Sequence, residues 1–270
     1  MKRLVLLPGL LAGGCVSAEA TSARCAVTDG VLSCSHETSI LADGVEDRRV
    51  HWQLPEGEAP EAGWPVAIGF QGSLASAELN WEASADTPAG GLFQVEATDQ
   101  LLAAGLAVIT PEAPAAGLGA WNTNVPPFAG EWDGAPDDIL MQSLFAGIEA
   151  GDFGPLNAES MVAFGISSGG YMTSRMALSY PGRMRRLVIL SASWATCVGI
   201  ACVLPDALPE DHPPTLFLHG GGDKIVPAFT MQAYADRLIV DGVEVETFVP
   251  VFIGHEWFAE APGMLVDWAR

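Results

Sequence analysis

Residues 162–172 read VAFGISSGGYM, an apolar run that stops abruptly at a turn of small residues. Glycines stand two residues before and two residues after Ser167, and a segment of helical composition follows over 171–180. A strand, a tight turn and a helix in this order form a nucleophile elbow, whose small residues let the serine adopt a strained backbone. Ser168 does not fit this spacing, because Ile166 stands where a glycine is required. The stretch predicts Ser167 as a nucleophile, and an ordinary glycine turn is the structural alternative.

Strands and helices alternate on both sides of this turn. The expected strands cover 65–70, 106–110, 160–164, 186–190, 214–219 and 243–249, and the expected helices cover 92–104, 137–150, 171–180, 228–240 and 258–269. Such alternation implies right-handed crossovers and a mostly parallel sheet. Apolar and polar residues alternate over 49–54, which predicts a half-exposed strand at an antiparallel edge, whereas residues 19–45 are expected to be irregular. The fold class is therefore α/β, with one doubly wound domain over 19–270.

The N-terminus has the composition of an export signal. Two basic residues precede a short apolar run over 4–11, and small residues that suit a signal peptidase follow at 16–18. Residues 1–18 are therefore expected to be a signal peptide, and the protein is expected to be secreted. A lipoprotein signal that ends before Cys15 is the alternative, in which Cys15 would be acylated and anchor the protein to a membrane surface.

Export makes the cysteines informative, because disulfides persist outside the cytoplasm. Cys25, Cys34, Cys197 and Cys202 remain after the signal. Four cysteines allow three pairings, and closeness in sequence favours Cys25 with Cys34 and Cys197 with Cys202. Four free buried thiols are the alternative. A metal site is not expected, since no histidine stands among the cysteines at ligand spacing.

The charge of the chain limits its partners. The formal net charge is −21 at pH 7, so nucleic acids and anionic membranes would be repelled. The body of the chain contains no stretch of about 20 apolar residues, and no transmembrane segment is expected there. The strongly negative net charge suggests that the substrate is uncharged or that the protein works at high salt concentration. The sequence does not indicate an oligomeric state.

A serine hydroxyl becomes a useful nucleophile only when an imidazole takes its proton and a carboxylate orients that imidazole. Asp223 follows the strand expected over 214–219, and His255 follows the next strand. The carboxyl ends of parallel strands share one rim of a sheet, so these residues can converge on Ser167. His219 precedes the acid and ends a strand, which favours a structural role. The other candidates for the base lie in loops or edge segments outside the expected order, namely His36, His51 and His212. The other candidates for the acid, Asp206 and Asp211, lie in a proline-rich loop before the strand.

Two further sets of residues are candidates for contacts with a substrate. Hydrolases with such an elbow take one oxyanion donor from the residue after the nucleophile and one from the loop after an early strand, which points to the backbone N–H groups of Ser168 and Ser73. A simple turn is the alternative for the loop that contains Ser73. Trp121, Trp194 and Trp257 follow expected strand ends or flank the triad segments, where they would line an acyl pocket or face a polymer; packing in the core is the alternative. A bond between Cys197 and Cys202 would stiffen the loop after Trp194.

The segment 164–172, FGISSGGYM, with Asp223 and His255 downstream, resembles the extracellular polyhydroxyalkanoate depolymerases. Its Gly-Ile-Ser-Ser-Gly string is most similar to the medium-chain-length branch. The resemblance implies a single-domain α/β-hydrolase fold and an exported serine esterase that cleaves the ester bonds of a bacterial storage polyester without metal or cofactor. It also implies that Ser167 is the nucleophile, Asp223 the orienting acid and His255 the general base. Short-chain relatives often add a linker and a polymer-binding domain, and their absence up to Arg270 favours the single-domain branch.

Two other functions are compatible with the same residues. One is a soluble carboxylesterase that acts on feruloyl, acetyl-xylan or other polyester-type substrates. The other is a surface lipoprotein that keeps the fold for binding and has no catalytic activity. The presence of all three triad residue types argues against the second.

Overall fold

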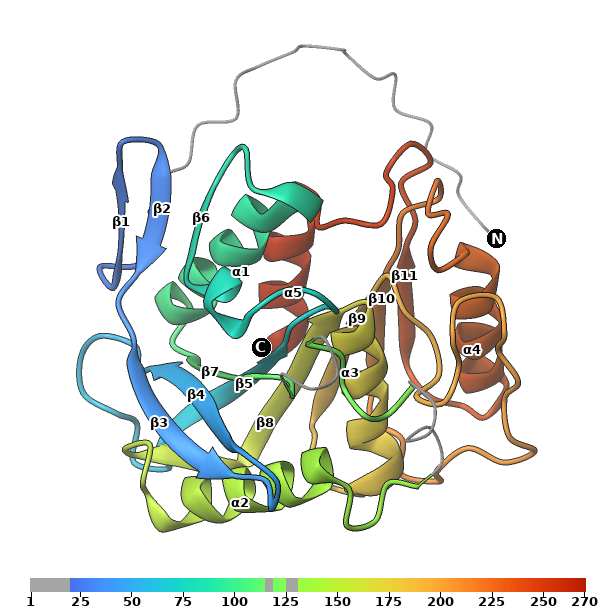
Figure 1. Cartoon of the computed structure of the whole chain (residues 1–270), viewed down its shortest axis with the longest axis horizontal. Helices are drawn as coiled ribbons and strands as arrows, with labels where there is room; N and C mark the ends of the chain where they lie inside the picture. The colour runs from blue at the N-terminus through green and yellow to red at the C-terminus, as the bar shows by residue number, and fades with distance from the viewer. Residues whose placement is uncertain (1–19, 115–118, 125–130) are drawn as a thin grey trace.

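The centre of the protein is a twisted, mostly parallel sheet (Figure 1). The computed structural model describes residues 20–114, 119–124 and 131–270, so the expected signal and Cys15 lie outside the described part. Within that part the sheet has eight strands in the order β11-β10-β9-β8-β5-β7-β4-β3. The strands are β3 (Glu37–Ala42), β4 (Asp47–Gln53), β5 (Trp64–Phe70), β7 (Ala107–Pro111), β8 (Leu156–Ile166), β9 (Arg186–Leu190), β10 (Thr215–Leu218) and β11 (Val245–Phe248).

Strand direction changes near one side of the sheet, as the sequence predicted. Neighbours from β7 through β11 run parallel, whereas β4 pairs antiparallel with both β7 and β3. The inner strands β7, β9 and β10 are almost wholly buried, because both of their faces are covered by helices and their sequences are continuous apolar runs. The exposed edge strand β3 alternates between exposed and half-buried residues instead.

Helices cover both faces of the sheet and create two apolar cores. One face carries α1 (Gly91–Ala103) and α5 (Ala261–Ala269), and the other carries α2 (Pro136–Ala150), α3 (Ser168–Ser179) and α4 (Ala228–Val240). Short 3-10 turns, η1 (Ala77–Asn80) and η2 (Pro88–Gly90), precede α1. The expected helices are all present, with ends within three residues of their predicted positions. None of the helices in the described part is long and apolar enough to cross a bilayer.

The segment expected to be irregular forms strands. β1 (Cys25–Thr28) and β2 (Val31–Cys34) make an antiparallel hairpin that continues into β6 (Glu82–Ser84). The hairpin turn is Asp29-Gly30, and both residues have positive φ, 51° and 81°. This pair is the residue combination that a two-residue primed turn favours, so the sequence contained a signal that the expectation over 19–45 overlooked.

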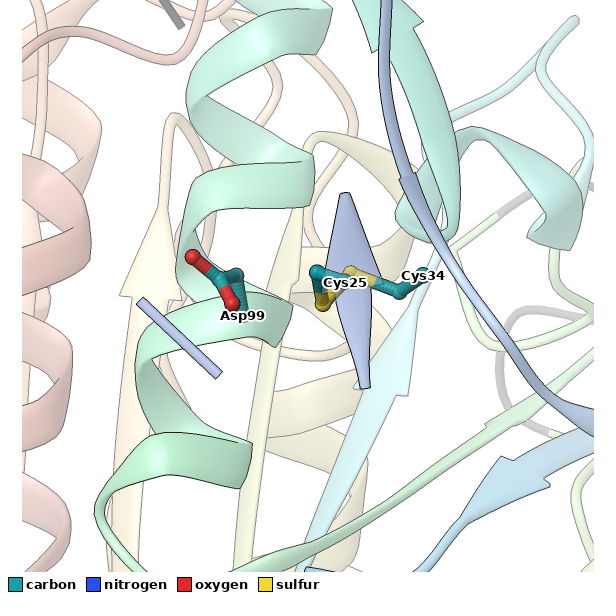
Figure 2. A group of neighbouring side chains, drawn as sticks. All are labelled: Cys25, Cys34 and Asp99. Atoms are coloured by element: carbon teal, nitrogen blue, oxygen red, sulfur yellow. A yellow bond between two sulfur atoms is a disulfide. The ribbon is translucent and has the colours of Figure 1, made fainter. Parts of the chain in front are cut away.

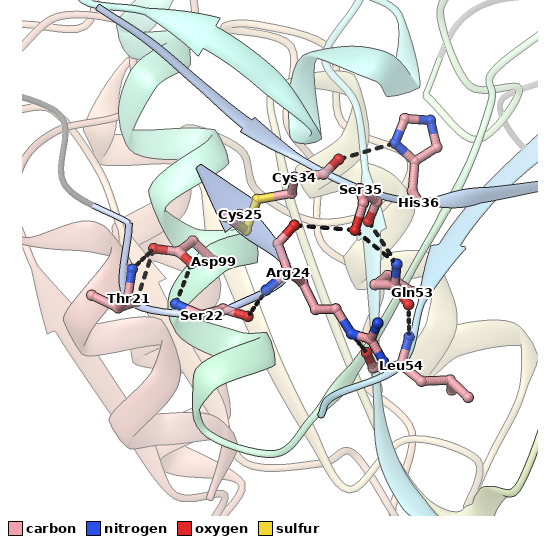
Figure 3. The surroundings of a disulfide bond; sticks show 10 residues. All are labelled: Thr21, Ser22, Arg24, Cys25, Cys34, Ser35, His36, Gln53, Leu54 and Asp99. Carbon is pink, nitrogen blue, oxygen red and sulfur yellow. Dashed lines mark hydrogen bonds between the residues drawn. A yellow bond between two sulfur atoms is a disulfide. The ribbon is translucent and has the colours of Figure 1, made fainter. Parts of the chain in front are cut away.

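Both favoured disulfides are present, Cys25–Cys34 and Cys197–Cys202. The first bond joins residues directly opposite each other in the hairpin. Residues just before the hairpin are held on α1 (Figure 3), where the Asp99 carboxylate accepts hydrogen bonds from the backbone amides of Thr21 and Ser22 at 2.6 and 2.7 Å. The disulfide ties the two strands of the hairpin together, and the hydrogen bonds to Asp99 attach the start of the hairpin to the α1 face of the domain.

Candidate active site

Ser167 occupies the strained turn that its sequence predicted. It lies between the last residue of β8 and the first residue of α3, with φ 56° and ψ −123°, a region that non-glycine residues seldom adopt. Its glycine neighbours are required by space: a Cβ on Gly169 would lie 2.0 Å from the carbonyl oxygen of Phe70, and one on Gly165 would lie 2.5 Å from that of Gly169. The Gly-x-Ser-x-Gly pattern therefore reflects close backbone packing around the turn.

The acid and the imidazole come together at the edge of the sheet where β10 and β11 end. His255 Nδ1 donates to Asp223 Oδ2 at 2.7 Å. The other carboxylate oxygen, Oδ1, accepts from the backbone N–H groups of Ile225 and Val226 at 2.8 and 2.9 Å. Because Nδ1 carries the proton of this hydrogen bond, the Nε2 atom of neutral His255 is left as the proton acceptor.

A second histidine also faces the acid. His219 is fully buried at the end of β10, and its Nε2–H donates to the carbonyl oxygen of Val226 at 2.7 Å. The same nitrogen lies 3.5 Å from Asp223 Oδ2. The structural role predicted for His219 is thus one of supporting the loop that carries Asp223.

These contacts determine the charge state of Asp223. Burial by itself would raise the pKa of this carboxyl, but hydrogen bonds from His219, His255 and the amide of Val226 outweigh burial and hold the pKa well below its usual range. Asp223 is therefore ionised at neutral and weakly acidic pH. An ionised acid orients the imidazole of His255 and stabilises the positive charge that the ring acquires when it takes a proton.

The glycine run that follows His219 brings the two loops into contact. The amide of Gly221 donates to Pro250 O at 2.9 Å, and the amide of Gly222 donates to Ile253 O at 2.8 Å. A Cβ on Gly220 would lie 2.1 Å from the carbonyl oxygen of Gly254. The loops that carry the acid and the base therefore lie directly against each other, which only glycine allows.

Ser167 and His255 line the same cavity, whose volume is about 110 Å³. Most of its wall is apolar and consists of Leu79, Pro88, Ala89, Ile166 and Trp257. Trp257 is held in place by its backbone, since its amide donates to Ala89 O at 2.9 Å. Sequence reasoning placed Trp257 here but missed Pro88 and Ala89, because η2 is far from the triad in the chain.

The two predicted oxyanion donors lie beside the nucleophile. Ser168 is the first residue of α3, where the helix dipole favours negative charge at the backbone N–H. On the other side, Gly72 approaches so closely that its Cβ would lie 3.6 Å from Ser167 Cβ, and Ser73 lines the cavity. The Ser168 side chain has another use, because its Oγ accepts from the amide of Trp121 at 2.9 Å.

The structure corrects the substrate contacts predicted for two of the tryptophans. Trp121 is fully buried, with its ring 5.2 Å from that of Phe70 and its Nε1–H donating to Gln71 O. Trp194 is also buried, with its ring 5.2 Å from that of Tyr234. Neither side chain presents a surface to a ligand. Both tryptophans pack in the core, which was the alternative to substrate contact.

The loop that contains Trp121 contacts the nucleophile elbow through the Trp121 amide and is itself held by hydrogen bonds to two helices. The Asn122 amide donates to Asp137 Oδ2 at 2.6 Å, and Arg175 Nε donates to Thr123 Oγ1 at 2.8 Å. Asp137 is also paired with Arg48 at 2.7 Å, and both side chains are buried. The loop is therefore fixed to α2 and α3.

One cluster in the described part has the residue types of a metal site, but its chemistry does not suit a cation. Atoms of Cys25, Cys34 and Asp99 lie within 4.8 Å of one another (Figure 2). The two sulfur atoms are bonded to each other, so neither is a thiolate, which is the form that binds a metal. The Asp99 oxygens already accept hydrogen bonds from Thr21 and Ser22. Within the cluster, the disulfide joins the two strands of the hairpin and Asp99 holds the preceding residues on α1.

His212, which its position in the sequence excluded as the base, makes a testable contribution to stability. Its Nδ1–H donates to Pro213 O at 2.9 Å, and its Nε2 accepts from Tyr234 Oη at 2.5 Å. The Tyr234 oxygen in turn accepts from Ser174 Oγ. Protonation of His212 would remove the acceptor of this chain, and burial lowers the pKa of His212 to about 4.

We expect this histidine to make the protein sensitive to acid. The unfolded chain takes up a proton near pH 6.5 and the folded chain only near pH 4, so the stabilisation is complete above pH 6.5 and is lost as the pH falls toward 4. The loss should reach about 2 to 3 kcal/mol. Urea unfolding at pH 7 and pH 4.5 measures it, and His212→Gln should show a correspondingly smaller difference between the two pH values. An equal difference in both proteins would contradict the assignment.

A serine in a strained strand-to-helix turn, with a carboxylate and a histidine on the loops after two later parallel strands, defines the α/β-hydrolase class. Solved structures share this fold at low sequence identity. An S-formylglutathione hydrolase from Staphylococcus aureus has a TM-score of 0.59 and 12% identity, covering 87% of this chain and 98% of its own. An esterase from Rhizomucor miehei has a TM-score of 0.57 and 14% identity, covering 88% and 81%. An acylaminoacyl peptidase from Pyrococcus horikoshii has a TM-score of 0.56 and 13% identity, and the match spans 83% of this chain but only 38% of the peptidase.

The particular family follows from sequence. No family model matches the chain. A poly(3-hydroxyoctanoate) depolymerase from Pseudomonas fluorescens is 43% identical, and the match covers 97% of this chain and 96% of that enzyme. The chain belongs to this family, the polyhydroxyalkanoate depolymerases, and the resemblance drawn from residues 164–172 is confirmed.

Proposed function

We propose that the protein hydrolyses the ester bonds of a medium-chain-length polyhydroxyalkanoate through an acyl-enzyme on Ser167. The observation that carries the proposal is the shared cavity, onto which Ser167 and the Asp223-bound His255 both open. The name of the relative from Pseudomonas fluorescens, a poly(3-hydroxyoctanoate) depolymerase, supports the choice of polyester. The mostly apolar wall of the cavity suits an alkyl side chain.

The proposed reaction uses the geometry in two steps. His255 Nε2 takes the proton of Ser167 as Oγ attacks the ester carbonyl carbon, and the oxyanion is held by the backbone N–H groups of Ser168 and Ser73. When the C–O bond breaks, His255 returns the proton to the departing hydroxyl end of the polymer. A water molecule then attacks the acyl-enzyme, with His255 again as base, and releases the carboxylate end and free Ser167. Asp223 keeps the ring in the required tautomer throughout.

Secretion belongs to the same proposal. Residues 1–18 would direct export and be removed, and the disulfides Cys25–Cys34 and Cys197–Cys202 fit an oxidising compartment. A lipid anchor on Cys15 is the alternative. Mass spectrometry of the mature N-terminus distinguishes a chain that starts near residue 19 from one that starts at an acylated Cys15.

A comparison of polyesters tests the proposed function. The purified protein should clear a latex of poly(3-hydroxyoctanoate) at least about tenfold faster than one of poly(3-hydroxybutyrate), because each methylene that finds an apolar wall favours the longer side chain. The rates are measured by turbidity at equal particle surface. Clearing of neither latex, together with hydrolysis of feruloyl or acetyl-xylan esters, would replace the proposal by that of a soluble carboxylesterase. Absence of all hydrolysis would favour a non-catalytic binding protein.

A further inference from the structure

Large apolar side chains are exposed on three loops at the carboxyl ends of β9, β10 and β11. The exposed segments cover 198–203, 225–229 and 249–252; the second ends in the first two residues of α4, and the loop after β11 leads toward α5 (Figure 1). Their most exposed apolar residues are Phe252 (98%), Val203 (85%), Ile200 (75%), Val251 (71%), Ile225 (64%) and Phe229 (64%). We call these six residues the apolar rim. Folded proteins seldom leave such side chains together in water unless they contact a partner.

The three loops are neighbours in space. A Cβ on Gly199 would lie 3.5 Å from the carbonyl oxygen of Ile225, which places the first loop against the second. A Cβ on Gly221, just before the second loop, would lie 3.0 Å from Val251 Cα in the third. The Cys197–Cys202 disulfide closes the first loop at its base. The rim residues therefore belong to one region, held by backbone contacts and a covalent bond.

The rim is continuous with the triad. Asp223 stands two residues before Ile225, and its Oδ1 accepts the amide of that residue. His255 follows Phe252 by three residues along the same loop. A partner surface in contact with the apolar rim would therefore lie beside the loops that carry Asp223 and His255, and His255 lines the catalytic cavity.

The stretches that bear the rim residues contain no charged side chain, although exposed Lys224 stands directly before Ile225 and charge is abundant in the chain. The sequence has 33 acidic residues in 270, yet 198–203, 225–229 and 249–252 contain no Asp, Glu, Lys or Arg. A neutral apolar surface can cover such loops without removing water from a charged group, which would be costly. An anionic membrane would be repelled by the rest of the molecule, whose formal charge is −21. A second copy of the chain seated here would lie over the loops that bear Asp223 and His255.

We propose that the apolar rim is the surface by which the protein adsorbs to its solid polyester. This inference rests on the proposed function and adds the site that brings an insoluble substrate to the cavity. The aliphatic side chains at the polymer surface would cover the rim and exclude water from it, while an adjacent ester enters the cavity beside Ser167. Binding to the solid and cleavage of the ester would therefore depend on different residues.

Phe229→Ser combined with Phe252→Ser tests the separation. Both rings are exposed, so their loss should not disturb the fold. Adsorption to poly(3-hydroxyoctanoate) latex, measured as depletion of protein from solution, should weaken at least about tenfold, and latex clearing at low protein concentration should fall in parallel. Turnover of dissolved p-nitrophenyl octanoate should stay within about twofold of the wild-type value.

A matched control removes exposed apolar residues elsewhere. Ile239 and Val240 are 54% and 80% exposed at the far end of α4, and Ile239→Ser with Val240→Ser should adsorb like the wild type. Equal adsorption of the rim variant, the control variant and the wild type would overturn the inference. So would a wild-type dimer that the rim variant converts to a monomer without change in adsorption. Adsorption is also measured with Ser167→Ala, so that loss of the proposed catalysis and loss of the rim are distinguished.

Discussion

Ser167→Ala is expected to lower kcat for ester hydrolysis by about a million-fold while leaving the fold intact. The hydroxyl is the only group at this position that can form the acyl-enzyme, and water attacking directly would lack the oriented proton transfer to His255. Alanine keeps the Cβ, so the strained backbone at φ 56° is not altered. Turnover of p-nitrophenyl octanoate and circular dichroism of the same samples measure the two effects.

The adjacent serine provides the control. Ser168→Ala keeps the backbone N–H that we propose as an oxyanion donor and removes only the Oγ that accepts from the Trp121 amide. Leaving that buried amide without a partner should cost about 1 to 3 kcal/mol of stability, and most of the activity should remain at low temperature. If Ser168→Ala abolished turnover and Ser167→Ala did not, the nucleophile would be misassigned.

The placement of the three candidate triad residues at one site could be predicted because its sequence signals are local and steric. The glycines around Ser167 stand where a Cβ would meet backbone atoms at 2.0 to 2.5 Å, so the pattern directly records the packing of β8 and α3. The positions of Asp223 and His255 followed from the order of strands, since successive parallel strands end on one rim. The pairing of cysteines followed from closeness in sequence. Each of these inferences needed only residues near one another or the regular topology of a parallel sheet.

Burial of the tryptophans could not be predicted in the same way. Trp194 is buried because Tyr234 of α4 packs on it, and Trp121 is buried because Phe70 of β5 does. Closeness to a triad segment in sequence says nothing about the direction in which a side chain points. The residues of the apolar rim illustrate the converse. Val251 and Phe252 stand four and three residues before His255, yet their exposure became visible only when the loops were placed.

Asp223→Asn is expected to lower kcat by about ten-thousand-fold. Donors face both oxygens of this carboxylate, namely the amides of Ile225 and Val226 at Oδ1 and the ring of His255 at Oδ2. An asparagine must place its NH₂ group at one of these positions. At the Oδ1 position it would oppose two fixed backbone N–H groups, so it should turn toward His255 instead. The amide then donates to Nδ1, which forces the proton onto Nε2.

That tautomer cannot accept the proton of Ser167, so the attack on the ester would lose its base even though every atom is nearly in place. His219 Nε2, 3.5 Å from the same carboxylate oxygen, would also face the new NH₂ group. The effect should therefore appear in kcat, with little change in KM for a dissolved ester. Asp206→Asn, at an exposed carboxylate before β10, is the control and should keep wild-type turnover. A comparable loss in both variants would mean that the acid acts through the general charge of the protein and not through the orientation of His255.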